Sequence, residues 1–286
     1  MKIIISPAKK MNIDTDTYPA AGFPQFLEDA EKLLHWMRKL DYPSAKALWR
    51  CNDQIASLNF ERYQNMQLRK NLTPAVLSYE GIQYRYMAPS VFTDQEFAYV
   101  QEHVRILSGF YGLLRPLDGV TPYRLEMQAR AAVAGTKDLY EYWGCRLYEA
   151  VMDQDRVVVN LASKEYSRCI ESYLRPGDRF LTCVFGELKD GKVIQKGTMA
   201  KMARGEMVRY MAGRQIGAEG TGDRAGEDRV KEQTETEAAP DKGIAACGSG
   251  ILDAELEKLK EFTELGYCYH EELSSQDTYV FIRNVD

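Results

Sequence analysis

The residues best suited to chemistry lie in one stretch, LSGFYGLLRPLDGVTPYRLEM, which spans Leu107–Met127. It contains two arginines, Arg115 and Arg124, on either side of a Pro-Leu-Asp-Gly turn. A guanidinium is permanently charged, and its planar fork of N–H donors matches the oxygens of a phosphate or a carboxylate. The stretch therefore predicts an anion site. The alternative is that both arginines are internal braces, with Arg115 paired to Asp118 and Arg124 paired to Glu126 or to a distant acid.

The backbone of this stretch is expected to be a shaped loop. Pro116 and Pro122 each remove a backbone donor and bias the preceding residue towards an extended conformation. A helix should lead into the loop, because Thr93 and Glu96 form a capping box that satisfies the first-turn amides of a helix. We expect that helix to run to about Leu107.

A second basic element is the helix predicted over Thr198–Arg214. At 100° per residue Lys201, Arg204 and Arg209 fall broadly on one side. The other side is apolar and suits the core; it carries Met199, Ala203, Met207, Tyr210 and Met211. One face of this helix can therefore enter the core while the other faces an anion.

Two predicted strands end in polar residues. Lys2–Ile5 reads as a buried strand that leads to Lys9, and the apolar run Arg156–Leu161 feeds a helix from about Lys164 to Leu174. Ser163 is placed to cap that helix, whose first amides can bind an anion. Plain helix capping is the alternative interpretation.

Several other segments are assigned only coarsely. Two short helices are predicted at Ser44–Arg50, capped by Ser44, and at Phe60–Met66, and Asp53–Asn59 joins them. The two helices form either an ordinary helical pair or a helix-hairpin-helix-like element that grips the DNA backbone. Further expected elements are a helix at Phe26–Arg38, strands at Ala75–Tyr79 and Gln83–Met87, a helix at Leu139–Met152, a hairpin of Arg179–Glu187 with Lys192–Lys196, a helical stripe at Ile251–Leu265 and a closing strand pair of Tyr267–Glu272 with Thr278–Arg283.

Charge is distributed unevenly along the 286 residues, whose formal net charge is −5. Residues 217–265 hold thirteen acids and six bases, whereas residues 175–214 hold nine bases and four acids. A local basic patch can attract a polyanion even when the whole chain is acidic; a solvated surface of mixed charge is the alternative. The segment Gly217–Gly250 is too poor in apolar residues to repay ordering, so we expect a mobile acidic insertion.

Bulk composition indicates an ordinary soluble protein, with 45% hydrophobic and 28% charged residues. The sequence shows neither an export signal nor an apolar run of about 20 residues, so a cytoplasmic protein without membrane contact is expected. The six cysteines stand singly and the three histidines are far apart. We therefore expect reduced thiols, no metal site and no cofactor, and nothing predicts a protein partner.

Six ordered blocks resemble the YaaA family of bacterial peroxide-stress proteins. They are ISPAK at Ile5–Lys9, LSGFYGLLRPLD at Leu107–Asp118, PYRLEM at Pro122–Met127, LYEYWG at Leu139–Gly144, NLASKEY at Asn160–Tyr166 and AKMARG at Ala200–Gly205. The likeness runs from Met1 to about Ile216 and resumes near Leu256. The resemblance implies a single mixed α/β (α+β) domain of unusual topology over residues 1–286, with a helix-hairpin-helix-like element at Ala47–Met66 and a basic cleft that binds DNA.

The resemblance also implies a role in resisting hydrogen peroxide, in which free iron is held down and damage to DNA and proteins is limited. By matched position the cleft would carry Lys9, Arg115, Arg124, Lys137, Lys201 and Arg204 as bases, with Tyr123, Asn160, Ser163 and Tyr166 as polar partners. Sequence-independent contacts to the DNA backbone are the expected mode of binding. The competing hypothesis is an enzyme acting on a nucleotide or another small phosphorylated substrate in the same cleft, with Glu126 or Glu165 as acid/base groups. No catalytic motif supports it, and binding without catalysis is the preferred interpretation.

Overall fold

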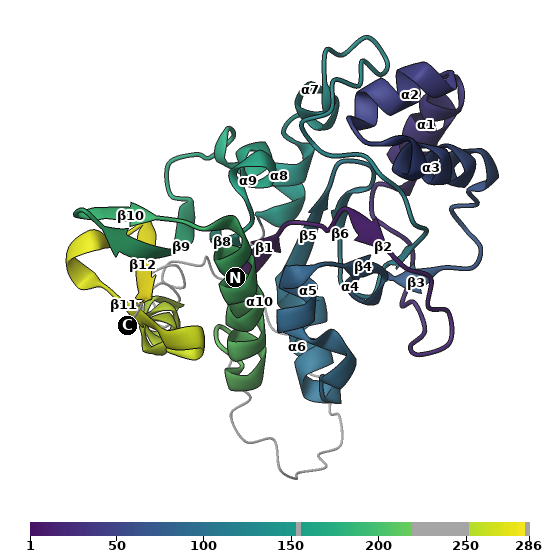
Figure 1. The fold of residues 1–286 in the computed structure, drawn as a ribbon. Coiled ribbons are helices and arrows are strands. Elements are labelled where there is room, and N and C mark those ends of the chain that lie inside the picture. Colours follow the sequence, from purple (N-terminus) through teal and green to yellow (C-terminus); the bar gives the residue numbers. More distant parts are fainter. Residues whose placement is uncertain (153–155, 219–251, 284–286) are drawn as a thin grey trace, which may run out of the picture.

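One mixed sheet of eight strands forms the centre of the described chain (Figure 1). The computed structural model describes residues 1–152, 156–218 and 252–283. The strand order is β11-β12-β9-β8-β1-β5-β6, and β10 pairs with β9. The strands are β1 (Lys2–Ile5), β5 (Val104–Ser108), β6 (Gly112–Leu114), β8 (Val157–Leu161), β9 (Arg179–Lys189), β10 (Lys192–Ile194), β11 (Tyr267–Tyr269) and β12 (Thr278–Arg283).

Five neighbouring strands of this sheet, β12, β9, β8, β1 and β5, run parallel. Every residue of β1 and β8 is buried, as a central parallel strand covered on both faces requires. After β1 the chain passes to β5 on one side, whereas after β8 it passes to β9 on the other. The carboxyl ends of β1 and β8 therefore form a topological switch point, where open α/β sheets bind ligands.

Helices pack against one another around the sheet (Figure 1). α1, α2 and α3 lie together at one corner, α8 packs against α9, and α10 lies against α5 and α6. The helices are α1 (Leu27–Arg38), α2 (Tyr42–Trp49), α3 (Asp53–Asn65), α4 (Ala75–Ser78), α5 (Ile82–Met87), α6 (Asp94–His103), α7 (Leu139–Trp143), α8 (Arg146–Val151), α9 (Lys164–Glu171) and α10 (Gly197–Arg214). Within the described ranges no helix is both long and apolar enough to cross a membrane.

Contact between α10 and α5 depends on Gly205. A Cβ atom at this position would lie 2.2 Å from the carbonyl oxygen of Gln83 and 2.9 Å from the amide of Met87. The two helices therefore meet backbone to backbone, and a glycine is required there because it has no side chain. This contact places Gln83 beside Arg204, the residue that precedes Gly205.

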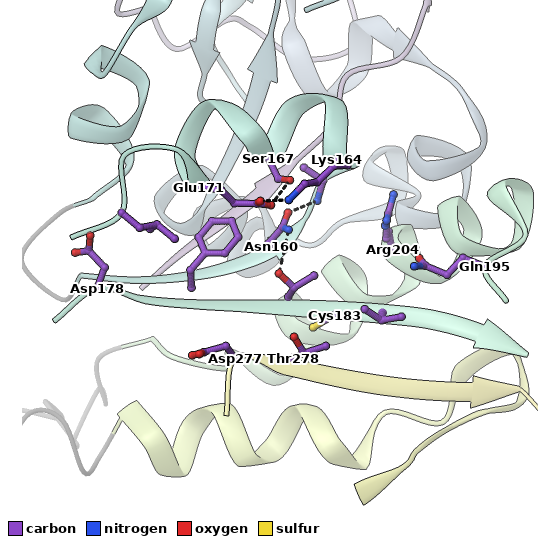
Figure 2. A pocket seen from close by; sticks show the side chains of 15 residues that line it. Asn160, Lys164, Ser167, Glu171, Asp178, Cys183, Gln195, Arg204, Asp277 and Thr278 are labelled. Atoms are coloured by element: carbon purple, nitrogen blue, oxygen red, sulfur yellow. Dashed lines mark hydrogen bonds and ion pairs between the residues drawn. The ribbon is translucent and has the colours of Figure 1, made fainter. Parts of the chain in front are cut away.

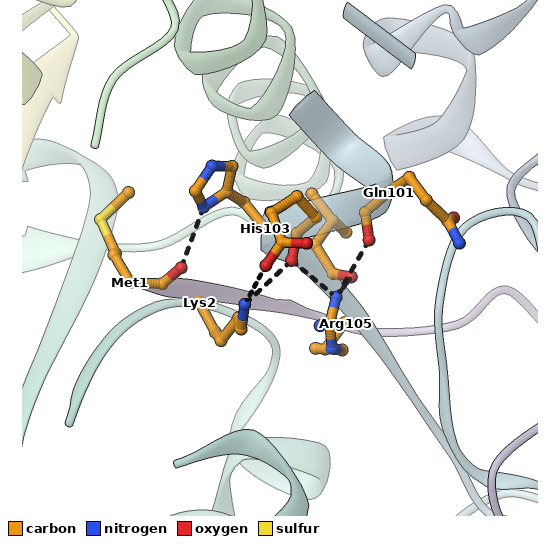
Figure 3. A network of polar contacts seen from close by, with 7 residues as sticks. Met1, Lys2, Gln101, His103 and Arg105 are labelled. Atoms are coloured by element: carbon orange, nitrogen blue, oxygen red, sulfur yellow. Dashed lines mark hydrogen bonds and ion pairs between the residues drawn. The ribbon is translucent and has the colours of Figure 1, made fainter. Parts of the chain in front are cut away.

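The beginning of β1 is held by a polar network at the end of α6 (Figure 3). The Lys2 ammonium donates to the Glu102 carboxylate at 2.7 Å and to its carbonyl at 3.1 Å. A ring nitrogen of His103 lies 3.0 Å from the Met1 carbonyl oxygen. Arg105 donates to the carbonyls of Gln101 and Glu102, where a cation opposes the negative end of the helix dipole. The network fixes the strand whose other end enters the candidate site.

Two short sheets attach the first and middle parts of the chain to each other. One pairs β2 (Lys10–Met11) with β4 (Tyr79–Glu80), and the other pairs β3 (Thr73–Pro74) with β7 (Gly119–Val120). The first holds the segment after β1 next to the turn between α4 and α5, and the second holds the segment before α4 against the central stretch.

Several expected elements are confirmed. The capping box is present, with Thr93 and Glu96 bonded reciprocally. β1, β8, α1, α10 and the β11–β12 pair lie where they were expected. The β9–β10 hairpin turns at Asp190 and Gly191, both with positive φ as its tight turn demands. All but the first two residues of the acidic segment Gly217–Gly250 lie outside the described residues, so that expectation stays a prediction.

The region around the central stretch corrects two predictions. The helix after the capping box ends at His103, because Val104–Ser108 pairs with β1 as strand β5. The stretch itself is not wholly loop, since it contains the end of β5 with β6 and β7. The strands expected at Ala75–Tyr79 and Gln83–Met87 are largely helical, forming α4 and α5.

Helix boundaries supply the remaining corrections. Asp53–Asn59 is the first half of α3 and not a connection, so the turn of the helical pair is only residues 50–52. Asp41 caps α2 by accepting from the Ser44 amide, so Ser44 is not the cap. The helix expected over Leu139–Met152 is divided at Gly144 into α7 and α8.

Candidate anion-binding groove

A pocket of about 390 Å³ lies at the carboxyl ends of β1 and β8. We call it the middle pocket. Seven of the ten candidate residues line it: Lys9, Tyr123, Arg124, Ser163, Tyr166, Lys201 and Arg204. They come from four separate parts of the chain, so the fold brings together most of the basic motifs that are distant in sequence.

The two strand ends are joined directly beside this pocket. The Ser163 amide donates to the Ser6 hydroxyl at 2.8 Å, and the two hydroxyls are 3.2 Å apart. The Tyr84 hydroxyl donates to the Ser6 carbonyl at 3.0 Å. Ser163 stands at the N-cap position of α9 but makes no side-chain capping bond, which corrects the expected cap. Its hydroxyl is held by Ser6 instead.

Arg124 and Glu126 form the floor of the pocket. Their side chains are each 12% exposed, and a guanidinium nitrogen lies 2.9 Å from the Glu126 carboxylate. Lys9, which is 65% exposed, approaches the same carboxylate at 3.2 Å. Arg124 therefore has the internal partner that the bracing interpretation expects. Its Nε, however, is buried and has no hydrogen-bond partner among the described residues.

Glu165 places a second carboxylate in the pocket. It accepts a hydrogen bond of 3.3 Å from the Gln128 amide. Burial raises the pKa of Glu165, and the negative charge of Glu126 raises it further. A carboxyl group with a raised pKa can hold a proton nearer neutral pH, which is what general acid and base chemistry needs.

The opposite wall is formed by α5 and α10. Arg204 is half-buried, its Nε is fully buried, and within the described ranges it has no carboxylate within 4.0 Å and no partner for Nε. Burial lowers its pKa. The amide nitrogen of Gln83, a residue only 5% exposed, is also without a partner there. Because an unpaired buried donor costs about 1–3 kcal/mol, these groups indicate a ligand that supplies acceptor oxygens.

Tyr123 serves mainly to position this site. Its hydroxyl lies 2.7 Å from that of Ser108 at the end of β5 and 2.8 Å from that of Tyr79. Burial raises its pKa, so the phenol stays protonated at neutral pH. The bonds hold Arg124 and Glu126 against the sheet. Tyr166 is similarly buried in the first turn of α9.

Two further pockets share residues with the middle pocket. One, of about 510 Å³, shares Lys9 and Glu126 and continues to Arg50, in the α2–α3 turn, and to Arg130. The other, of about 580 Å³, shares Arg204 and continues over Asn160. The three form one continuous series, which we call the groove. Its α2 side belongs to the α2–α3 helical pair.

Figure 2 shows the pocket beyond Arg204. Lys164 pairs with Glu171, which also accepts a 2.5 Å hydrogen bond from the Ser167 hydroxyl. The Asn160 amide donates to the Thr182 hydroxyl at 3.3 Å. Arg204 lines both this pocket (Figure 2) and the middle pocket, and among the described residues it forms no ion pair.

Two candidate residues lie outside the groove. Arg115 lines a separate pocket with Asp118, whose carboxylate accepts from the Arg115 amide at 2.8 Å. Lys137 is exposed just before α7, and its amide donates to Glu141 at 2.7 Å. Among the groove residues, Gln83 and Arg50 had no signal in the sequence, because no motif distinguishes them from surface or core positions. Ser6 lies in the ISPAK block, but its bond to Ser163 had no local signal. In the described part of the chain no three His, Cys, Asp or Glu side chains gather as metal ligands would.

The fold and the groove define a mixed α/β protein with a candidate anion site at a sheet switch point. The chain belongs to the YaaA peroxide stress protein family, whose model, described as "Peroxide stress protein YaaA", matches residues 1–220. A "UPF0246 protein" of Agathobacter rectalis is 47% identical over 285 residues, covering 100% of both chains. One of Lachnoclostridium phytofermentans is 46% identical, covering 99% of this chain and 96% of its own. One of Lactiplantibacillus plantarum is 53% identical over 76% of this chain and 87% of its own.

Proposed function

We propose that this protein binds DNA along the groove, through the phosphate backbone and without reading sequence, as its part in the peroxide stress response. The middle pocket and its neighbour at α2 are lined by seven bases and three acids. The bases are Lys9, Lys10, Arg50, Arg124, Arg130, Lys201 and Arg204. Contacts from such side chains to phosphate oxygens position a protein on DNA but carry no sequence information.

The observation that carries this proposal is the unneutralised state of Arg204. A partly buried guanidinium is stabilised by a nearby anion, and the described residues supply none within 4.0 Å. A phosphate in the groove would supply it. Lys201, one helical turn earlier on α10, is exposed and faces the same pocket.

The same contacts give a physical route by which the protein would limit iron-dependent damage to DNA. Bases that neutralise phosphates release the cations condensed there, and ferrous ions are among the cations that DNA attracts. Bound protein would therefore move the site of peroxide chemistry away from the duplex. The peroxide part of this proposal is supported by the family; protection of proteins, which the resemblance also implies, is proposed on the family alone.

The test is a titration of duplex and branched DNA at several salt concentrations with Lys201→Ala and Arg124→Ala. Each variant should bind up to about fivefold more weakly and show a salt slope reduced by about one. The matched control is Arg209→Ala, an exposed arginine of α10 that lies outside all three pockets, and it should bind like the unmodified protein. Absence of binding at low salt, or an equal loss in the control, would overturn the proposal.

The second candidate function is an enzyme acting on a nucleotide or another small phosphorylated substrate in the same cleft. The observation that favours it is the pairing of two carboxylates in different environments: Glu126 beside two cations and Glu165 with a raised pKa. Turnover of a nucleotide panel that is abolished by Glu165→Gln would support catalysis. Unchanged nucleotides after prolonged incubation would leave the groove a binding site.

A further inference from the structure

We propose that the middle pocket binds one nucleoside monophosphate. Its phosphate would lie on the α5–α10 wall, and the donor groups of its base or sugar would lie on the wall of Glu126 and Glu165. The inference rests on the second candidate function for its location, and it names the ligand class and its orientation. It concerns binding and does not depend on turnover or on DNA running along the groove.

The phosphate end follows from the unused donors. Arg204 Nε and Gln83 Nε2 are buried, have no hydrogen-bond partner among the described residues, and line this pocket. The backbone contact at Gly205 brings them to the same wall. Lys201 adds a third cationic or donor group on that wall. A phosphate monoester offers several acceptor oxygens in a compact group, which suits donors arriving from two helices.

The other end follows from the two carboxylates. Glu126 and Glu165 both line the middle pocket, away from the α5–α10 wall. Such a pair repels a second phosphate but accepts hydrogen bonds from amino or hydroxyl groups. A ligand with one anionic end and donor groups at the other meets both walls of the pocket.

Size agrees with this assignment. The pocket volume of about 390 Å³ falls at the small end of the roughly 300–1,000 Å³ of small-molecule sites. It also lies at the switch point between β1 and β8, where parallel sheets hold mononucleotides and dinucleotides. A monophosphate therefore fits better than a nucleotide with a longer phosphate chain.

The ligand can come from two sources that share this chemistry: a free nucleotide, or the terminal nucleotide of a DNA strand with a 5′-phosphate. Competition distinguishes them. If an oligonucleotide with a 5′-phosphate displaces a bound nucleoside monophosphate and the same oligonucleotide with a 5′-hydroxyl does not, the ligand includes strand ends. If neither displaces it, the pocket selects the free nucleotide.

The experiment is calorimetric titration of the full chain with the four deoxynucleoside 5′-monophosphates, the matching nucleosides and inorganic phosphate. At least one monophosphate should bind. Its nucleoside lacks the phosphate and should bind at least about tenfold more weakly, because a charged hydrogen bond contributes roughly 1.5–3 kcal/mol. Arg204→Met and Gln83→Leu should each weaken binding of the monophosphate, whereas the control Arg209→Met should not. Glu165→Leu should weaken binding of the monophosphate and leave the affinity for inorganic phosphate unchanged.

Arg204→Lys keeps the charge and removes Nε, so it tests the site if Arg204→Met fails to fold; it should bind the monophosphate more weakly than the unmodified protein. Failure of every monophosphate to bind at millimolar concentration would overturn the proposal. So would monophosphate binding that Arg204→Lys and Gln83→Leu leave unchanged. In either case DNA binding that is lost in Lys201→Ala would still uphold the proposed DNA function, so the two failures are distinguishable.

Discussion

The Ser163 amide donates a hydrogen bond of 2.8 Å to the hydroxyl of Ser6, although 157 residues separate them. The bond joins the segments that follow β1 and β8, and both segments line the middle pocket. Neither serine has to contact a ligand to affect binding. The bond between them fixes the segment that carries Lys9 and the segment that begins α9.

Ser6→Ala is therefore expected to destabilise the protein by about 1 kcal/mol and to weaken DNA binding. The substitution leaves the Ser163 amide without its partner, which costs roughly the energy of a hydrogen bond. Urea unfolding and DNA titration measure the two effects. Ser172→Ala, at an exposed serine that ends α9, is the control and should change neither. Equal stability of both variants would show that the Ser6 bond contributes nothing.

Gly205→Ala should destabilise the protein by about 1–3 kcal/mol, because its Cβ would lie 2.2 Å from the Gln83 carbonyl oxygen and force α5 and α10 apart. Gly213→Ala in the same helix is the matched control. Its Cβ meets only a flexible carboxylate at 3.6 Å, so the better helix propensity of alanine should stabilise by up to about 1 kcal/mol. Denaturant midpoints of the two variants should move in opposite directions. A shift of both in the same direction would contradict the contact.

Asp118 should make stability fall as pH rises from about 4 to about 7. Burial raises the pKa of its carboxyl to about 6 in the folded protein, from 3.8. The folded state therefore holds the proton more tightly than the unfolded state, and that advantage is lost as the folded carboxyl ionises. The full effect is about 3 kcal/mol. Asp118→Asn, which stays neutral, should lack this contribution in urea unfolding measured across the range, and an identical pH slope in both proteins would refute it.

Arg115→Ala should leave the affinity for DNA within about twofold, whereas Arg124→Ala should lower it. Both arginines belong to the same stretch, but only Arg124 lines the groove; Arg115 lines another pocket beside Asp118. DNA titration at fixed salt compares the two directly. A loss in Arg115→Ala equal to that in Arg124→Ala would mean that the bound DNA extends to the second pocket.

Local signals in the sequence were sufficient for several elements. The Thr93 capping box and the Asp190-Gly191 turn were predictable because their hydrogen bonds and dihedral angles involve neighbouring residues. The end of α6 was not. Val104 and Leu107 continue a helical stripe by spacing, and pairing with β1 decides that they form a strand.

The residues of the site also divide into those that local motifs predict and those that depend on distant contacts. Motifs indicated the bases of the middle pocket, because Lys9, Arg124 and Arg204 each lie in a distinctive local sequence. Gln83 and the separate position of Arg115 could not be predicted, since they depend on contacts between distant segments. The contact of Gly205 with Gln83 is one such case, because neither residue identifies the other in the sequence.

Shared walls between the three pockets have a thermodynamic consequence. Lys9 and Glu126 belong to two of them, and Arg204 belongs to another two. If adjoining pockets both bind ligands, as proposed, those ligands would compete for the same cations. Such antagonism is reciprocal: if a small ligand lowers the affinity for a long polyanion by some factor, the polyanion lowers the affinity for the small ligand by the same factor. The concentration of one would thereby report on, and regulate, the release of the other.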